Sequence, residues 1–177
     1  MLEFVAIPVV LGLMLAIRPV RQTVFHTSRV AVRTLFGGWL KAFQTQRLIY
    51  PPKPSELTTN NRIFENWVQS YQELLRYTSF KEPTLINFSL PDENSNKVTQ
   101  TLWDILANRD QYPNGNEQIN CVNVMADGTD GNEMMLHYGV GKLPQIVLLK
   151  KQMPVGRYIP GNNFNPEDLR HWISTIH

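Results

Sequence analysis

Cysteine is nearly absent from this chain of 177 residues. The single cysteine, Cys121, excludes an internal disulfide and a cysteine-based metal cluster, because both need further thiols. It lies within Ile119–Met125, INCVNVM, which has the composition of a buried strand. We therefore expect Cys121 to be a small buried hydrophobe and not a reactive thiol.

Acidic residues are missing from the early part of the chain, since none lies between Glu3 and Glu56. From Pro54 to His177, ten lysines and arginines stand against fourteen acids, although the whole chain has a net charge of +2. This asymmetry indicates that the first part faces a membrane, an import machinery or a polyanion, and that the rest is a mildly acidic domain. The acid-free interval contains seven cations: Arg18, Arg21, Arg29, Arg33, Lys41, Arg47 and Lys53.

A long hydrophobic run is also missing, because the apolar segment Phe4–Ile17 has only fourteen residues. As a helix it would be ~21 Å long, which is shorter than the ~30 Å hydrocarbon core of a bilayer. Met1, Leu2 and flanking arginines that reach the headgroups would extend it, so we predict a short membrane anchor over residues 1–21. A secretory signal is disfavoured, since its positive charge precedes the apolar run. The residues that would carry the anchor are Phe4, Ile7, Val10, Leu13, Ile17, Arg18 and Arg21.

Residues 22–49 are rich in Arg, Ser and Thr, contain no acid and include interleaved apolar side chains. This composition is typical of a mitochondrial targeting sequence or of a basic amphipathic helix on an anionic leaflet. We predict membrane anchoring, with a cleaved transit peptide and a soluble N-terminal helix as alternatives. The positive-inside rule places the rest of the chain in the cytosol or the mitochondrial matrix.

A proline-rich linker, residues 50–60, precedes a predicted domain over residues 61–177, because the prolines of YPPKP stop a helix. Within the domain, strand-like runs alternate with segments of helical period. Strands separated by helices pair in parallel, and a closing hairpin adds antiparallel strands. We therefore predict an α/β fold with a mixed central sheet, preceded by the N-terminal membrane or amphipathic helix. The expected elements are helix Asn61–Thr78, strand Thr84–Leu90, helix Lys97–Asn108, strand Ile119–Met125, helix Gly131–Tyr138, strands Gln145–Lys150 and Val155–Tyr158, and a final helix capped by Asn165 that runs to the C-terminus.

The segment His137–Gly161, HYGVGKLPQIVLLKKQMPVGRYIPG, leads from a helix end through Leu-Pro into two strands. It resembles the second half of the thioredoxin fold, and the resemblance covers roughly Thr84–Ile176. It implies a thioredoxin-like three-layer α/β/α domain, in which the bond between Leu143 and Pro144 is cis and borders the substrate groove.

The redox motif of that family is missing from the matching positions. Aligning Leu85–Phe88 with the family's strand places Glu93-Asn94-Ser95-Asn96 on the Cys-x-x-Cys motif. Glu93 and Asn96 then replace the two sulfurs, and Asn87 falls where oxidoreductase members often keep a buried acid. Thiol–disulfide exchange needs an attacking thiolate and a partner sulfur. The resemblance therefore does not extend to oxidoreductase activity, and we expect no catalytic residue.

Other chemical sites are not indicated by the sequence. Asp92 and Glu93 stand at the start of an expected helix, where acids satisfy unpaired backbone N–H groups. The loop Asp127–Glu133 lacks the 1-3-5 acid spacing of a calcium loop, and the histidines show no metal-ligand spacing. No glycine-rich phosphate loop is present, and an acidic domain argues against nucleic-acid binding. We therefore predict no metal, no cofactor, no nucleic acid and no small-molecule substrate.

These features predict a non-catalytic thioredoxin-like scaffold or accessory subunit of a membrane protein complex, held at the bilayer through its N-terminus. The expected location is the mitochondrial inner membrane with the domain in the matrix, and the alternative is the outer membrane or the ER with a cytosolic domain. Two other functions stay open, namely a thiol- or glutathione-dependent enzyme using Cys121 and a chaperone-like peptide binder. The predicted contact surface is a groove formed by Leu143, Pro144, Asp92, Glu93, Asn94, Ser95 and Asn96.

Overall fold

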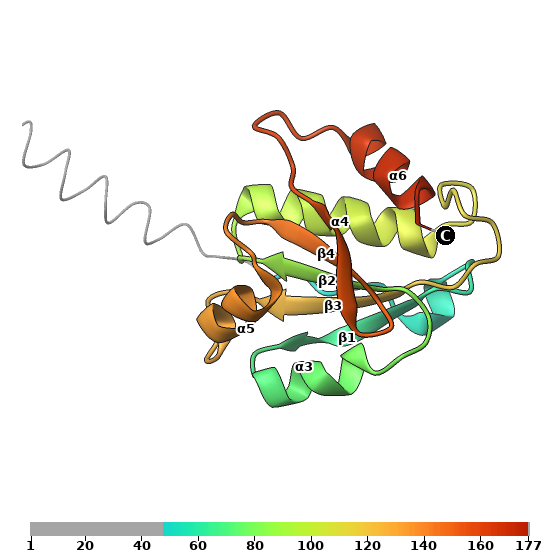
Figure 1. Cartoon of the computed structure of the whole chain (residues 1–177). Helices are drawn as coiled ribbons and strands as arrows, with labels where there is room; N and C mark the ends of the chain where they lie inside the picture. Colours follow the sequence, from blue (N-terminus) through green and yellow to red (C-terminus); the bar gives the residue numbers. More distant parts are fainter. Residues whose placement is uncertain (1–47, 177) are drawn as a thin grey trace, which may run out of the picture. The chain divides into compact units, whose positions relative to one another are not determined.

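The computed structural model describes residues 48–176 (Figure 1). The anchor predicted for residues 1–21 and the basic segment up to residue 47 lie outside the described residues. Within residues 48–176, none of the helices has both the length and the apolar character needed to cross a membrane.

A mixed sheet of five strands forms the centre of the domain, in the order β1-β3-β2-β4-β5. Strands β1, β3 and β2 run parallel, whereas β4 is antiparallel to β2 and β5 is antiparallel to β4. The predicted mixed sheet is thus confirmed, with parallel strands before the closing hairpin. The strands are β1 (Arg62–Val68), β2 (Thr84–Ser89), β3 (Asn120–Met125), β4 (Gln145–Lys150) and β5 (Met153–Tyr158).

Burial on both faces explains the apolar runs of the central strands. Every residue of β2 is buried, and β3 and β4 are buried up to their last residue. Such strands have no solvent face, so their sequences lack a polar alternation. The edge strand β5 has no buried residue, and its sequence is correspondingly mixed.

Helices cover both faces of the sheet. In Figure 1, α4 (Glu93–Ala107) and α6 (Pro166–Ser174) lie on one side, and α3 (Tyr71–Thr78) lies on the other, the side on which α5 (Gly131–Tyr138) also packs. The core is correspondingly split into two clusters. One joins residues of α4 and α6 to the sheet, including Leu85, Leu102, Trp103, Cys121, Ile146 and Leu169. The other joins residues of α3 and α5 to the sheet, including Leu74, Ile86, Val122, Met134 and Val147.

The helix predicted over Asn61–Thr78 is wrong, because the chain forms two elements there. Residues 62–68 form strand β1, and α3 begins only at Tyr71. The side chain of Ser70 accepts a hydrogen bond from the Glu73 backbone N–H and so caps α3. The sequence Ser70-x-x-Glu73 is a capping pattern, and it marks the start of α3 in the middle of the segment predicted as one helix.

Other predicted elements are confirmed with shifted ends. Helix α4 begins at Glu93, four residues before the prediction, because Asp92 caps it. Strand β5 begins at Met153, before the predicted Val155. Asn165 caps α6 as predicted, but the helix ends at Ser174 and does not reach the C-terminus.

Much of the stretch before β1 packs on the domain. The indole N–H of Trp67 donates to the Ile49 carbonyl at 2.8 Å. A short 3-10 helix, Pro54–Glu56, follows, and the backbone N–H of Thr58 donates to the Ala107 carbonyl at the end of α4 at 2.8 Å. This arm, residues 48–59, is thereby fastened to both β1 and α4. Three of its apolar side chains pack against the core: Leu48, Ile49 and Leu57.

Both edge strands are irregular. The register of β1 on β3 shifts between Ile63 and Trp67, and that of β4 on β5 shifts between Leu148 and Leu149. Strand β5 also contains Pro154, which has no N–H to donate. Bulges and prolines of this kind interrupt the regular hydrogen-bonding edge that an added strand would need.

Candidate functional site

A pocket of about 500 Å³ opens beside Leu143 and Pro144. Three elements form its walls, namely the first turns of α4, the loop before β4 and the loop between β5 and α6. The α4 wall consists of Asn94, Lys97 and Val98, the β4 loop supplies Lys142, Leu143 and Pro144, and the β5–α6 loop supplies Pro160, Gly161, Asn162, Asn163 and Phe164.

The loop that carries Leu143 and Pro144 is held between α5 and β5. The peptide bond between these two residues is cis, as the resemblance implies. Gly139 ends α5 with a φ of 63°, a left-handed conformation that glycine adopts without a steric penalty. Beside it, Nη2 of Arg157 on β5 donates to the Tyr138 carbonyl at 3.1 Å. The end of α5 is therefore tied to the edge strand, which fixes where the loop begins.

The first turn of α4 is closed by its cap. The Asp92 carboxylate accepts from the backbone N–H of Ser95 at 2.9 Å and from its hydroxyl at 2.8 Å. The capping role predicted for Asp92 is therefore confirmed. Glu93 and Asn94 are exposed, Ser95 is buried and Asn96 is half-buried.

The predicted groove residues separate into two groups. Asn94, Leu143 and Pro144 line the pocket together. The remaining four belong to the same end of α4 but are not part of the lining, and their role in binding stays a prediction: Asp92, Glu93, Ser95 and Asn96.

Two parts of the lining are not among the predicted groove residues. Lys97 and Lys142 flank predicted groove residues, and the segment Pro160–Phe164 closes the pocket from β5. A signal for this segment was present, because Pro160-Gly161 followed by two asparagines marks a turn after the last strand. In this topology that turn must pass from β5 to α6 on the α4 side of the sheet.

Sulfur chemistry is not available at this site. The chain has one cysteine, and the two positions aligned with the redox motif hold Glu93 and Asn96. Dithiol–disulfide exchange needs two sulfurs at this turn. The domain is therefore not a classical dithiol oxidoreductase.

Cys121 lies within the sheet, away from the pocket. It is on β3, fully buried in the core beneath α4 and α6. Burial raises the pKa of its thiol well above the ordinary range, because the thiolate would lose its hydration. The thiol is thus protonated and inaccessible to solvent. The prediction that Cys121 is a small buried side chain is confirmed.

Polar side chains beneath α4 form a network without any ionisable group. The Asn87 amide donates to the Thr99 hydroxyl at 2.9 Å and to Oδ1 of Asn123 at 3.2 Å. The Trp103 indole donates to the same Asn123 oxygen at 3.1 Å, and the hydroxyls of Ser89 and Thr99 lie 3.1 Å apart. These side chains are buried, so their hydrogen bonds substitute for water and bind α4 to the sheet.

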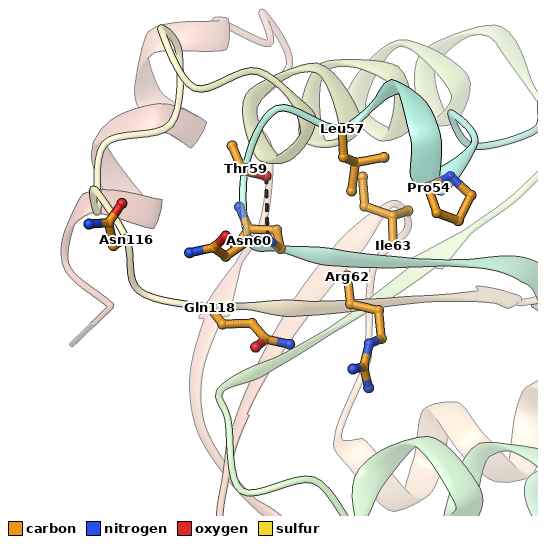
Figure 2. Close-up of a pocket in the computed structure, with 9 residues that line it drawn as sticks. Pro54, Leu57, Thr59, Asn60, Arg62, Ile63, Asn116 and Gln118 are labelled. Atoms are coloured by element: carbon orange, nitrogen blue, oxygen red, sulfur yellow. Dashed lines mark hydrogen bonds between the residues drawn. The ribbon is translucent and has the colours of Figure 1, made fainter.

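A second pocket, of about 440 Å³, lies where the arm meets the start of β1 (Figure 2). Four of its nine lining residues have side-chain amides, and Arg62 and Gln118 point to the same side of the sheet in Figure 2. Asn61 belongs to this lining, and its side chain is engaged within the domain: the amide nitrogen donates to the Leu106 carbonyl at 2.9 Å and the oxygen accepts from the Ile119 N–H at 2.8 Å. We therefore interpret this pocket as the place where the arm packs against α4 and the start of β3.

Metal ligands do not gather in the part of the chain that the structure describes. No group of three His, Cys, Asp or Glu side chains in residues 48–176 is arranged to hold an ion. In the Asp127–Glu133 loop, the carboxylate of Asp130 accepts a hydrogen bond from the Tyr71 backbone N–H at 3.0 Å.

Solved structures with a similar architecture include thioredoxins. A point mutant of thioredoxin from Halobacterium salinarum NRC-1 aligns with a TM-score of 0.51 and 16% identity, over 67% of this chain and 94% of that one. Thioredoxin O2 from Arabidopsis thaliana, in its oxidized state, aligns with a TM-score of 0.50 and 10% identity, over 68% of this chain and 97% of that one. No protein-family model matches the chain, and no curated protein matches its sequence. At these identities the likeness establishes the fold alone, and that fold is thioredoxin-like.

Proposed function

We propose that this protein is a non-catalytic thioredoxin-like subunit that holds an extended segment of a partner protein in the pocket beside Leu143 and Pro144. One observation carries the proposal. A pocket lies beside Leu143 and Pro144, where the resemblance places the substrate groove, while both positions aligned with the sulfurs of a thioredoxin hold Glu93 and Asn96. A pocket without a nucleophile supports binding and not exchange.

The N-terminal sequence supports a membrane setting for this function. The apolar run Phe4–Ile17 and the acid-free basic segment after it favour an anchor in the mitochondrial inner membrane, with the domain in the matrix. The protein would then act as a scaffold or accessory subunit of a complex in that membrane. The outer membrane or the ER, with the domain in the cytosol, is the alternative location. Carbonate extraction and protease protection of fractionated mitochondria test both the anchoring and the side.

The binding role is tested by two matched substitutions in the full chain. Leu143→Asp places a carboxylate in the pocket, whereas Leu136→Asp places one on α5, where the leucine is 83% exposed and outside the lining. We expect Leu143→Asp to lower the amount of co-purified partner about tenfold or more, a loss of ~1.4 kcal/mol or more. Leu136→Asp should leave it unchanged. Thermal melting of both variants controls for unfolding, and full partner recovery with folded Leu143→Asp would refute the proposal.

The enzymatic alternative can be separated from this role by Cys121→Ser. A sealed, protonated thiol gives no support to a glutathione-dependent or single-thiol mechanism. A chaperone-like binder differs from a fixed subunit in its range of ligands. Affinity purification that recovers one stoichiometric partner supports the subunit, whereas many unrelated unfolded proteins would support the chaperone.

A further inference from the structure

Positive charge is concentrated on the part of the chain that builds two walls of the pocket. From Met134 to Pro166 there is no acidic residue, and this stretch carries four cations, Lys142, Lys150, Lys151 and Arg157. Pro54–His177 contains ten lysines and arginines and fourteen acids. When the four cations of this stretch are left out, six cations remain against the fourteen acids. The domain is therefore acidic overall and this stretch is the exception, and Lys142 is the cation of the stretch that lines the pocket.

The pocket itself repeats this pattern. Its lining has two charged side chains, Lys97 on α4 and Lys142 on the facing loop, and both are exposed and cationic. No aspartate or glutamate belongs to the lining. Two acids, Asp92 and Glu93, directly precede the α4 wall, and the carboxylate of Asp92 accepts hydrogen bonds from the backbone N–H and the hydroxyl of Ser95. Glu93 is exposed in the same turn but is not part of the lining.

The neutral part of the lining suits a polypeptide in an extended conformation. Three asparagines, Asn94, Asn162 and Asn163, offer both amide donors and acceptors along the rim. Apolar side chains, among them Val98 and Phe164, belong to the same lining as the two lysines and provide a surface for one hydrophobic residue. Hydrogen bonds to a backbone, an apolar contact and paired cations are thus available in one place.

We infer that the pocket selects an extended segment of a partner protein in which an acidic residue lies next to an apolar one. The inference rests on the proposed function and specifies the partner. The apolar side chain contacts Val98, Leu143 and Phe164, while the carboxylate pairs with Lys97 or Lys142. The acidic remainder of the domain repels such a segment from other surfaces and so directs it to this pocket. Segments rich in lysine or arginine are rejected at the same site, because like charges meet there.

The test uses the full chain in detergent micelles to select binders from a random peptide library. We expect enrichment of Asp and Glu next to Leu, Ile, Val or Phe. Because exposed ion pairs are modest, each of Lys97→Gln and Lys142→Gln should weaken a selected peptide about two- to fivefold, and the double variant more. Lys151→Gln removes a cation of the same stretch outside the lining and should have no effect. Replacing Glu by Gln in the peptide should remove the difference between the double variant and the wild type.

Each other result contradicts the inference in a distinct way. Binders that lack acids but are lost with Leu143→Asp would overturn the acidic selectivity and leave the proposed function standing. Binders that ignore Leu143→Asp, or no binders at all, would overturn both. Displacement of a selected peptide by phosphatidylserine vesicles but not by phosphatidylcholine vesicles would assign the lysines to lipid headgroups. Self-association lost in the double variant would assign the pocket to a second copy of the chain.

Discussion

The side-chain amide of Asn87 donates to Oδ1 of Asn123 at 3.2 Å, between two residues that face each other on the parallel strands β2 and β3. The same Asn87 nitrogen donates to Thr99 on α4. All three side chains are buried, and none of them can carry a charge. The domain thus has an uncharged hydrogen-bond network between the sheet and α4. By the resemblance to thioredoxins, Asn87 occupies the position where oxidoreductase members often keep a buried acid.

A carboxylate at this position should destabilise the domain. Asn87→Asp keeps the shape of the side chain, but it places a negative charge without hydration next to the Asn123 oxygen. Burial would raise the pKa of the new carboxyl, so the penalty is present above the ordinary carboxyl pKa of ~4 and fades as the pH falls toward it. We expect a loss of about 2–4 kcal/mol in unfolding free energy at pH 7. Urea unfolding of Asn94→Asp, at an exposed position, provides the control and should show almost no loss.

The contact between α5 and β5 predicts a coupled pair of substitutions. Gly139 has a φ of 63°, and a Cβ atom there would lie 2.6 Å from Nη2 of Arg157. Gly139→Ala should therefore cost about 1–2 kcal/mol for the left-handed backbone, with an added cost for moving the arginine. In an Arg157→Ala background the added cost should vanish, which a double-mutant cycle measures. Gly141→Ala is the matched control, because a Cβ atom there meets nothing within 4 Å.

Tyr112 predicts a loss of stability in alkaline solution. Its side chain is 6% exposed, and its hydroxyl donates to the Glu117 carbonyl at 2.9 Å. Burial, with a smaller contribution from the Glu117 charge, raises its pKa from 10.0 to about 12. The folded state therefore holds the proton more tightly, and its stability is complete below about pH 10 and falls as the pH rises toward 12. Tyr112→Phe should reduce this fall by about 2–3 kcal/mol, measured by urea unfolding across the range. An identical slope in the variant would contradict the assignment.

The Cys121 thiol should be protected in the folded chain. Because the sulfur is fully buried and protonated, iodoacetamide should alkylate it only when the domain opens. Mass spectrometry should show a rate that rises with added urea in parallel with unfolding. Cys121→Ser should leave partner recovery unchanged, although it places a hydroxyl in the core. Fast alkylation of the folded protein would show that the thiol is accessible.

The hairpin between β4 and β5 should accept stabilising residues. Lys151 and Gln152 form its loop with φ values of 49° and 68°. This left-handed backbone conformation is unfavourable for residues other than glycine, asparagine and aspartate. Replacing the pair by Asn-Gly should raise the unfolding free energy by about 1 kcal/mol, seen as a higher melting temperature. An unchanged or lower melting temperature would show that the loop conformation is not limiting.

The order of strands and helices along the chain after Thr84 could be predicted because each element carries its signal within its own residues. Residues 84–90 and 119–125 are short apolar runs bounded by turn residues, and both are buried strands. The Asn165-Pro166 start of α6 carries its own cap and first-turn residue, so it was visible without tertiary context. These signals depend on neighbours in sequence, which is why they could be recognised.

The region before Thr84 could not be assigned from the same signals. Ile63, Trp67, Leu74 and Leu75 fit a helical period across two different elements, because β1 is interrupted by a register shift and does not alternate regularly. The pocket posed a different difficulty. Lys97, Lys142 and Phe164 are distant in sequence and meet only through the sheet topology. The replacement of both sulfurs by Glu93 and Asn96, by contrast, was legible from the order of residues alone.

The irregular edges of the sheet have a consequence for assembly. Because β1 has a register shift and β5 contains a proline, neither edge of the sheet has an uninterrupted row of backbone hydrogen-bonding groups. Copies held close together on a surface are therefore hindered from joining edge to edge into filaments. In the proposed function, an extended partner chain binds in the pocket beside Leu143, and each domain contributes one such contact. The number of partner segments bound should then equal the number of domains present.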